Sequence, residues 1–171
     1  MTRMKWTEMA LRGGQLQRFH TWPTIGHETI AEHSFGVAMI VLALTDYRAS
    51  ANLLKAALYH DLAEQETGDI PANAKWDNPM FSTFLEVMED SFNIKWKLDI
   101  TLPPQDQIVL KWADMLQMLL FCKQQRDLGN RNMDTIFERV VEFLNKFKFL
   151  AEGQEMLAAI LTSYDRSKAN E

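Results

Sequence analysis

Apolar side chains recur along most of the chain at intervals of three and four residues, the spacing that places them on one face of an α-helix. The clearest case is segment 29–48, in which Ile30, Val37, Ile40, Val41 and Leu44 follow this spacing. No segment is a convincing strand. The pattern predicts about seven helices, at 2–16, 29–48, 51–66, 79–92, 105–128, 133–149 and 152–164.

Glycine and proline supply the expected ends of these helices. The segment 67–71 reads Thr-Gly-Asp-Ile-Pro and cannot continue the third helix, because both glycine and proline break helices. Ser50 is a candidate N-cap for that helix. Pro103 and Pro104 start the long helix, and Gly129 stops it.

Composition supports a helical fold. Ala, Leu and Met account for 46 residues, whereas Val and Ile account for only 15. Good helix formers therefore outnumber β-branched aliphatic residues about threefold, which favours an all-α helical bundle. A chain of 171 residues is expected to form one domain. Its candidate motifs fall within 17–120, and the C-terminal helices are expected within 131–165.

Charge and residue usage narrow the classes of partner. The net charge of −5 weighs against wholesale binding of nucleic acid, which normally requires a basic surface. The longest apolar run, 37–44, is far shorter than the ~18 residues of a membrane span. The first 15 residues lack a leader-like apolar region. Cys122 is the only cysteine, which excludes an internal disulfide and suggests a reducing compartment. We expect a cytoplasmic protein.

Candidate metal ligands follow one another along the predicted helices. His33 lies in the second helix, His60 and Asp61 near the end of the third, and Asp114 within an apolar stretch of the long helix. A buried carboxylate needs a salt bridge, hydrogen bonds or a metal ion. Two imidazoles and two carboxylates from three helices could hold a divalent cation and leave positions for water and substrate. Taken singly, each residue also has a structural explanation, such as a surface His-Asp pair, a core histidine or an acid paired with arginine.

The order and context of these residues are recognisable. The segments AEHS at 31–34, HDLAEQETGDIP at 60–71 and KWAD at 111–114 resemble the motifs of the HD-domain phosphohydrolases. Within that family they resemble the YfbR-like 5′-deoxynucleotidase branch, over about residues 17–120. Length and the third motif are similar to those of the DatZ-type phage dATP triphosphohydrolases.

The resemblance implies an all-α fold, a divalent metal ion and hydrolysis of a phosphate ester. It implies that the metal ligands are His33, His60, Asp61 and Asp114. Zn²⁺ or Co²⁺ is the expected ion, and Mn²⁺, Fe²⁺ or Mg²⁺ is compatible with the nitrogen and oxygen ligands.

The resemblance also implies two catalytic acids. Glu64, three residues after Asp61, would orient or deprotonate the attacking water. Asp69 would act in the catalytic shell, as an acid or as a partner of water. The structural alternatives are a solvent-facing helix glutamate and an ordinary turn residue.

Substrate contacts are expected from basic and apolar residues near the motifs. Arg18, Lys75 and Lys111 are candidates for binding phosphate. Trp22 or Ile25 could border the deoxyribose and exclude a 2′-hydroxyl group, although either could equally be a core residue. Cys122 is interpreted as a buried thiol rather than a nucleophile.

These features predict a metal-dependent phosphohydrolase acting on a small-molecule deoxynucleotide, with dATP preferred and the dATP pool of a phage-infected cell depleted as a result. The alternatives are a deoxynucleoside 5′-monophosphatase and a nucleotide-binding module without turnover. Family resemblance also predicts a homo-oligomer, either a dimer or a hexamer. No nucleic acid or membrane partner is expected.

Overall fold

The computed structural model describes the backbone of residues 1–169 and the side chains of residues 1–71 and 74–165. Within these residues the fold is helical, with one small antiparallel sheet, and the prediction of an all-α fold is confirmed. None of the described helices is long and apolar enough to cross a membrane. The elements are α1 (Arg3–Gly14), β1 (Gln17–Arg18), β2 (Glu28–Thr29), α2 (Ile30–Leu44), α3 (Ala51–Tyr59), α4 (Glu64–Thr67), α5 (Ala72–Asp77), α6 (Pro79–Trp96), α7 (Pro104–Asp127), α8 (Asp134–Lys146) and α9 (Ala151–Ala169).

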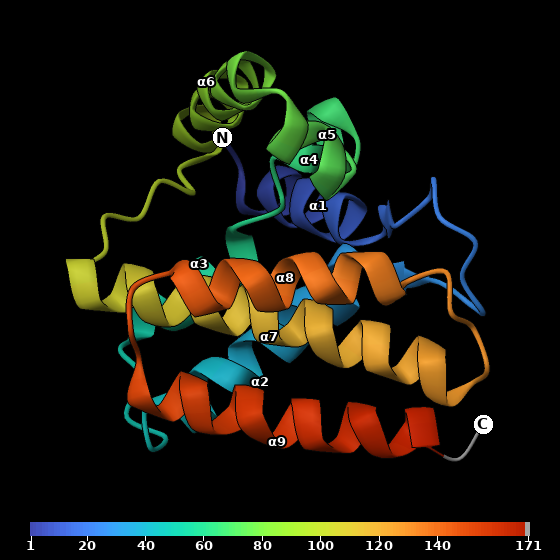
Figure 1. Ribbon diagram of the computed structural model, residues 1–171. Helices are drawn as coiled ribbons and strands as arrows, with labels where there is room; N and C mark the ends of the chain where they lie inside the picture. Colours follow the sequence, from blue (N-terminus) through green and yellow to red (C-terminus); the bar gives the residue numbers. More distant parts are fainter. Residues whose placement is uncertain (170–171) are drawn as a thin grey trace.

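Helix α7 runs through the centre of the molecule and packs against α2, α8 and α9 (Figure 1). Its side chains Trp112, Leu116 and Leu119 are completely buried in the main hydrophobic core. A Cβ atom on Gly153 of α9 would lie 2.5 Å from the Trp112 ring, so this glycine allows the close approach of the two helices. Helices α4, α5 and α6 form the upper part of the molecule in Figure 1, above α3 and α8.

The predicted helix over 51–66 is wrong, because α3 ends at Tyr59. The ring of His60 donates from Nδ1 to the carbonyl of Ala57, at 2.9 Å. In a continuing α-helix that carbonyl would accept from the backbone N–H of Asp61. The following backbone bonds span three residues instead of four, as in Glu64 N–H to Asp61 O at 3.0 Å. His60 and Asp61 therefore lie in a tight turn between α3 and α4.

The expectation that the chain has no strand is also wrong. β1 and β2 pair in antiparallel register, with Arg18 directly opposite Glu28 and Gln17 opposite Thr29. Strands of two residues are too short to produce a periodic pattern in the sequence. Their effect is to bring Arg18 and Glu28, ten residues apart, to the start of α2.

The number of helices rises from the expected seven to nine within the described residues, because the turn after α3 separates α4 and because α5 follows Pro71. Helix α2 ends at Leu44 instead of 48. The Thr45 hydroxyl donates to the carbonyl of Val41, and Asp46 and Tyr47 adopt left-handed φ angles of 49° and 61°. This left-handed turn cannot belong to a right-handed helix.

Candidate functional site

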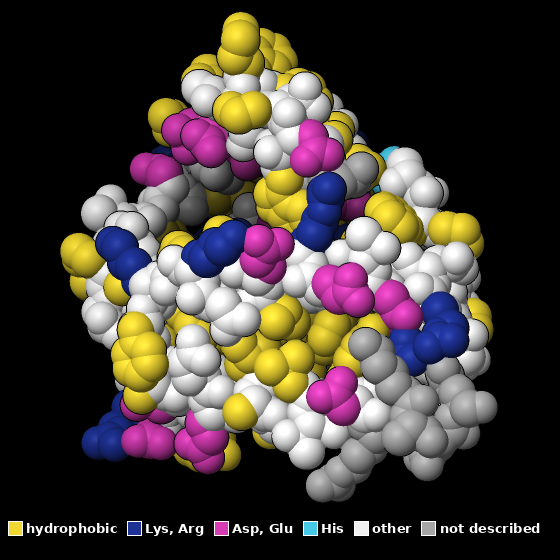
Figure 2. Space-filling view, in the orientation of Figure 1, with side chains coloured by type: hydrophobic (Ala, Val, Ile, Leu, Met, Phe, Trp, Pro, Cys, Tyr) yellow, Lys and Arg dark blue, Asp and Glu magenta, His cyan; other side chains and the backbone are white. Residues whose placement is uncertain are grey.

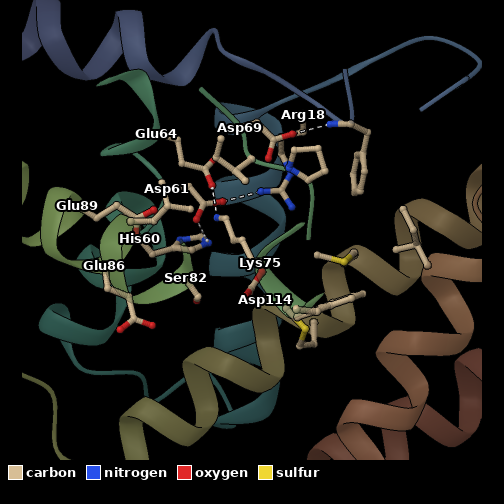
Figure 3. A pocket seen from close by; sticks show the side chains of 18 of the residues that line it. Arg18, His60, Asp61, Glu64, Asp69, Lys75, Ser82, Glu86, Glu89 and Asp114 are labelled. Atoms are coloured by element: carbon tan, nitrogen blue, oxygen red, sulfur yellow. Dashed lines mark hydrogen bonds and ion pairs between the residues drawn. The ribbon is translucent and has the colours of Figure 1, made fainter. Parts of the chain in front are cut away.

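The predicted metal ligands lie between α2, the turn after α3, and α7: His33, His60 and Asp61 offer ligand atoms within 4.8 Å of one another, and Asp114 lies beside His33. The Nε2 atoms of His33 and His60 are 3.1 Å apart. The nearest oxygens of Asp61 and Asp114 lie 3.4 Å and 3.5 Å from His33 Nε2. A capping box at Thr29 and Glu32 starts α2 just before His33, and α7 carries Asp114 within its buried face. Figure 3 shows His60, Asp61 and Asp114 on the side facing a cavity.

The protonation of the two histidines is set by the groups on their far sides. His33 Nδ1 lies 2.5 Å from the side-chain oxygen of Gln117, and His60 Nδ1 lies 2.9 Å from the Ala57 carbonyl. Because these oxygens only accept hydrogen bonds, both rings carry their proton on Nδ1. Both Nε2 atoms therefore present lone pairs to each other and to the carboxylates. A cation between them removes this repulsion, so the residues fit a divalent ion with nitrogen and oxygen ligands.

The charge states of the acids and of His60 also suit a cation. Burial lowers the pKa of His60, which favours its neutral form. Burial alone would raise the pKa of Asp61, but His60 and Arg18 lower it to about 2. Burial likewise opposes ionisation of Asp114, yet Lys111, 3.0 Å away, holds the pKa of Asp114 well below its ordinary value. Neutral imidazoles and ionised carboxylates are the forms that bind metal ions.

A cavity of about 320 Å³ opens beside this cluster. His33 is fully buried behind its wall, and Ile25 does not reach it. The backbone N–H and carbonyl of Ile25 are instead bonded to the side chain of Gln125, and the Ile25 side chain is about half exposed. The other predicted site residues line the cavity, namely Arg18, Trp22, His60, Asp61, Glu64, Asp69, Lys75, Lys111 and Asp114.

Glu64 combines burial with one free acceptor. Its Oε1 atom accepts from Lys75 Nζ at 3.1 Å, and its Oε2 atom is buried without a hydrogen bond from the described residues. Burial, followed by repulsion from Asp61, raises the pKa of Glu64 to about 8, although Lys75 opposes this rise. A carboxyl group with a pKa near neutrality can both accept and release a proton, as a general base must.

Asp69 holds the loop that follows β1. Its Oδ2 atom accepts from the backbone N–H of Phe19 at 2.8 Å. Phe19 has a left-handed φ of 55° and its ring stacks on Phe121. Asp69 thus fixes the turn between Arg18 and the loop that carries Trp22, while its side chain borders the cavity.

Arg18 is held by two acids. Its Nη1 atom donates to Asp61 Oδ2 at 2.6 Å, and its Nε atom lies 3.3 Å from Glu28 Oε2. Burial opposes the charge on Arg18, but the two carboxylates raise its pKa above the ordinary value. Arg18 is only 6% exposed, so it stabilises the buried acids as well as bordering the cavity.

The sequence analysis missed two groups of residues. Ser82, Glu86 and Glu89 of α6 line the cavity (Figure 3). Their spacing of four and three residues puts them on one helix face, a signal that the apolar residues of α6 obscured. Gln117 was missed as well, although it follows Asp114 by three residues and is a lone amide in an apolar stretch.

Comparisons with known proteins agree with this geometry. The family model of the YfbR-like 5′-deoxynucleotidases matches residues 6–107. The 5′-deoxynucleotidase YfbR of Salmonella arizonae is 26% identical over 179 residues, covering 90% of this chain and 88% of the relative. The fold is similar to that of an HD-domain phosphohydrolase from Listeria innocua, with a TM-score of 0.76, 19% identity and coverage of 96% and 90%.

A second solved structure is the HD phosphohydrolase DatZ of cyanophage S-2L, bound to dA and one catalytic Zn²⁺ ion. Its TM-score is 0.68 at 22% identity, and the match covers 100% of this chain and 99% of that protein. The family match spans more than half of the chain and includes His33, His60, Asp61, Glu64 and Asp69. The chain therefore belongs to the YfbR-like 5′-deoxynucleotidase family and is an HD-domain nucleotide phosphohydrolase.

Proposed function

We propose that this protein is a dATP triphosphohydrolase that uses one divalent ion, held by His33, His60, Asp61 and Asp114. The observation that carries the proposal is the convergence of these four ligands beside a cavity that also contains Glu64 and three basic side chains. The dA and Zn²⁺ bound by the DatZ phosphohydrolase support a deoxyadenosine substrate and Zn²⁺ as the ion. The proposed setting is the cytoplasm of a phage-infected cell, in which hydrolysis depletes the dATP pool.

The reaction divides between the ion and the surrounding side chains. When bound, a divalent ion supplies positive charge to phosphoryl oxygens and makes water more acidic. Glu64 accepts the proton of the attacking water at Oε2, its free acceptor. The proton taken up by Glu64 is proposed to pass to the leaving 5′-oxygen, and Asp69, which also lines the cavity, is proposed to assist as an acid or as a partner of water. Trp22 in the cavity wall is proposed to contact the deoxyribose.

The length of the phosphate chain depends on Lys75 and Lys111. Both line the cavity, and each is paired with an acid, Glu64 or Asp114, at 3.1 Å and 3.0 Å. An incoming triphosphate competes for these ammonium groups. Attack at the phosphorus nearest the sugar then yields deoxyadenosine and triphosphate.

A deoxynucleoside 5′-monophosphatase is the second candidate, because the curated relatives carry the name 5′-deoxynucleotidase. In that reaction the ion and Arg18 suffice for a single phosphate. A binding module without turnover is disfavoured, because it has no need for a buried acid such as Glu64 that lines the cavity and has an oxygen without a hydrogen bond from the described residues.

The test is hydrolysis of a panel of deoxy- and ribonucleotides with one, two or three phosphates, with the products resolved. We expect dATP to give deoxyadenosine and triphosphate. Lys75→Ala and Lys111→Ala should reduce kcat/KM for dATP much more than for dAMP, because the lost contacts lie beyond the α-phosphate. Lys123→Ala, which removes a lysine paired with Asp127 on the surface of α7, is the matched control. Equal losses on both substrates would favour the monophosphatase.

We also propose that the chain forms a homo-oligomer, a dimer or a hexamer. The outward face of α6 carries exposed apolar side chains, including Met80, Phe84, Val87 and Ile94, and Figure 2 shows hydrophobic side chains at the top of the molecule, where α6 lies. Burying such a face in a symmetric contact removes apolar area from water. Light scattering at micromolar concentration tests this proposal, and a monomer mass would contradict it.

A further inference from the structure

A chain of buried polar side chains runs behind the metal ligands and connects two of them. It passes from Asp61 through Arg18, Glu28 and Gln117 to His33. The links measure 2.6 Å from Arg18 to Asp61, 3.3 Å from Arg18 to Glu28, 2.6 Å from Gln117 to Glu28 and 2.5 Å from Gln117 to His33. We propose that Glu28 and Gln117 are positioning residues that keep the proton of His33 on Nδ1 and so direct its Nε2 lone pair at the metal ion.

The charged side chains of Arg18 and Glu28 set which group donates and which accepts along this chain. Arg18 can only donate, and an ionised Glu28 can only accept. Arg18 Nε forms an ion pair with Glu28 Oε2 at 3.3 Å without a hydrogen bond between them, whereas the amide NH₂ of Gln117 donates to Glu28 Oε1 at 2.6 Å. The amide oxygen of Gln117 is then left for His33. Because that oxygen only accepts, His33 must carry its proton on Nδ1.

Packing prevents the chain from rearranging. His33 is 0% exposed, Arg18 and Glu28 are each 6% exposed and Gln117 is 9% exposed, so little water can replace a lost partner. The strand pairing holds Arg18 opposite Glu28. Gly36, three residues after His33 on α2, leaves room for Gln117, since a Cβ atom there would lie 2.8 Å from Gln117 Cγ.

The consequence of the chain is chemical. A histidine binds a metal ion through a nitrogen that carries no proton, and the hydrogen bond of its other nitrogen selects which one that is. Losing such a partner typically weakens metal binding 10–100-fold. The inference rests on the proposed function in one respect, namely that His33 is a ligand. Its test is made on metal-free protein and on metal affinity.

Glu28→Gln is the decisive variant, because glutamine has the same shape as glutamate and residue 28 is not bonded to any predicted metal ligand. The positive charge of Arg18 attracts the oxygen of the new amide, as it attracts Glu28 Oε2, so the NH₂ group of that amide faces Gln117. Gln117 must rotate to accept, which turns its own NH₂ group towards His33. We expect the His33 proton to move from Nδ1 to Nε2, as read from ¹⁵N–¹H correlation spectra of the imidazoles in the metal-free protein. We expect the dissociation constant for Zn²⁺ to rise 10–100-fold.

A compensating substitution distinguishes this mechanism from a loss of packing. In the double variant Glu28→Gln, Gln117→Glu, the carboxylate stands at position 117 and accepts from both His33 and the amide at position 28. The direction of every bond is restored, so the Nδ1 proton and Zn²⁺ affinity should return towards those of the original protein. A general packing defect would become worse with a second buried substitution.

Two further variants make the result decisive even if Glu28→Gln folds poorly. Gln117→Leu removes the partner of His33 outright and should weaken Zn²⁺ binding to the same extent. Gln125→Leu is its matched control, because Gln125 is a buried amide on the same helix, 2% exposed, that bonds to Ile25 instead of a ligand. It should leave Zn²⁺ affinity and the His33 proton unchanged.

The inference is overturned if folded Glu28→Gln keeps the proton on Nδ1 and binds Zn²⁺ as the original protein does. It is also overturned if Gln125→Leu weakens Zn²⁺ binding as much as Gln117→Leu. These results would leave the proposed function standing. Conversely, the original protein could fail to hydrolyse nucleotides while the His33 proton moves as expected in Glu28→Gln. That result would reject the proposed function and keep this inference.

Discussion

Replacing Arg18 by leucine should destabilise the metal-free protein more than replacing an exposed charged residue does. The substitution introduces an apolar side chain of similar volume and removes the guanidinium group. That group lies between two buried acids, Asp61 at 2.6 Å and Glu28 at 3.3 Å. Removing one member of a buried ion pair costs about 3–5 kcal/mol, because the remaining charge stays buried without its partner. Since His60 still lies beside Asp61 and Gln117 still donates to Glu28, we expect the lower end, about 3 kcal/mol.

The loss should depend on pH in a defined direction. Burial already raises the pKa of Glu28, and Arg18 opposes that rise. Without Arg18 the folded protein holds a proton on Glu28 more readily than the unfolded chain does. A carboxyl group with a raised folded-state pKa favours the folded state at low pH and loses that effect as pH rises. The deficit of Arg18→Leu should therefore shrink as pH falls from about 7 towards 5.

The assay is urea unfolding of metal-free protein at both pH values, followed by circular dichroism. Arg48→Leu is the control, because Arg48 forms an ion pair of 3.2 Å with Asp46 in which both side chains are about 80% exposed. Exposed pairs contribute at most about 1 kcal/mol. A loss for Arg18→Leu no larger than that for Arg48→Leu, or one that is independent of pH, would refute the reasoning.

Three other outcomes are expected. Glu64→Gln should retain the metal ion and nucleotide binding while kcat falls by about 10²–10⁴, the usual contribution of a general base; loss of the ion, measured by elemental analysis, would mean that Glu64 is a ligand. Gly153→Ala should lower the free energy of unfolding by about 1–3 kcal/mol because its methyl group meets the Trp112 ring at 2.5 Å. Gly13→Ala should cost less in the same urea titration, because its nearest contact is the flexible end of Leu62 at 3.2 Å and its other contacts lie at 3.5 Å. Cys122 is 1% exposed and burial raises its thiol pKa, so alkylation, followed by mass spectrometry, should be slow in the folded protein and fast in urea.

Local sequence signals predicted much of the fold. The paired prolines at 103–104 and the spacing of apolar residues correctly indicated α7 and α2, and the Ser50 cap correctly indicated the start of α3. The turn after α3 could not be predicted from such local signals. At this turn the His60 ring donates a hydrogen bond to the Ala57 carbonyl, and the spacing of apolar residues does not indicate such a side-chain bond. The strand pair was missed for a related reason, since two residues are too few to show alternation.

The candidate site shows the same division. The motifs predicted four metal ligands; the structure clusters His33, His60 and Asp61 and places Asp114 3.5 Å from His33, and their binding of a metal ion stays a prediction. The partners behind them were not predicted, because Gln117 approaches His33 from a position 84 residues away in the chain. Ile25 was expected at the cavity from its place near the motifs, yet its backbone is bonded to the Gln125 side chain and Ile25 does not line the cavity. Such placements depend on tertiary packing and leave no periodic trace in the sequence.

The most direct test of the account is a metal titration of protein that has been stripped with a chelator. Bound Zn²⁺ or Co²⁺ and release of triphosphate from dATP are measured on the same samples as the ion is returned. The account predicts no turnover in metal-free protein, activity that rises in proportion to bound metal up to one ion per chain, and loss of both binding and turnover in Asp61→Ala. Full turnover by metal-free protein would contradict it.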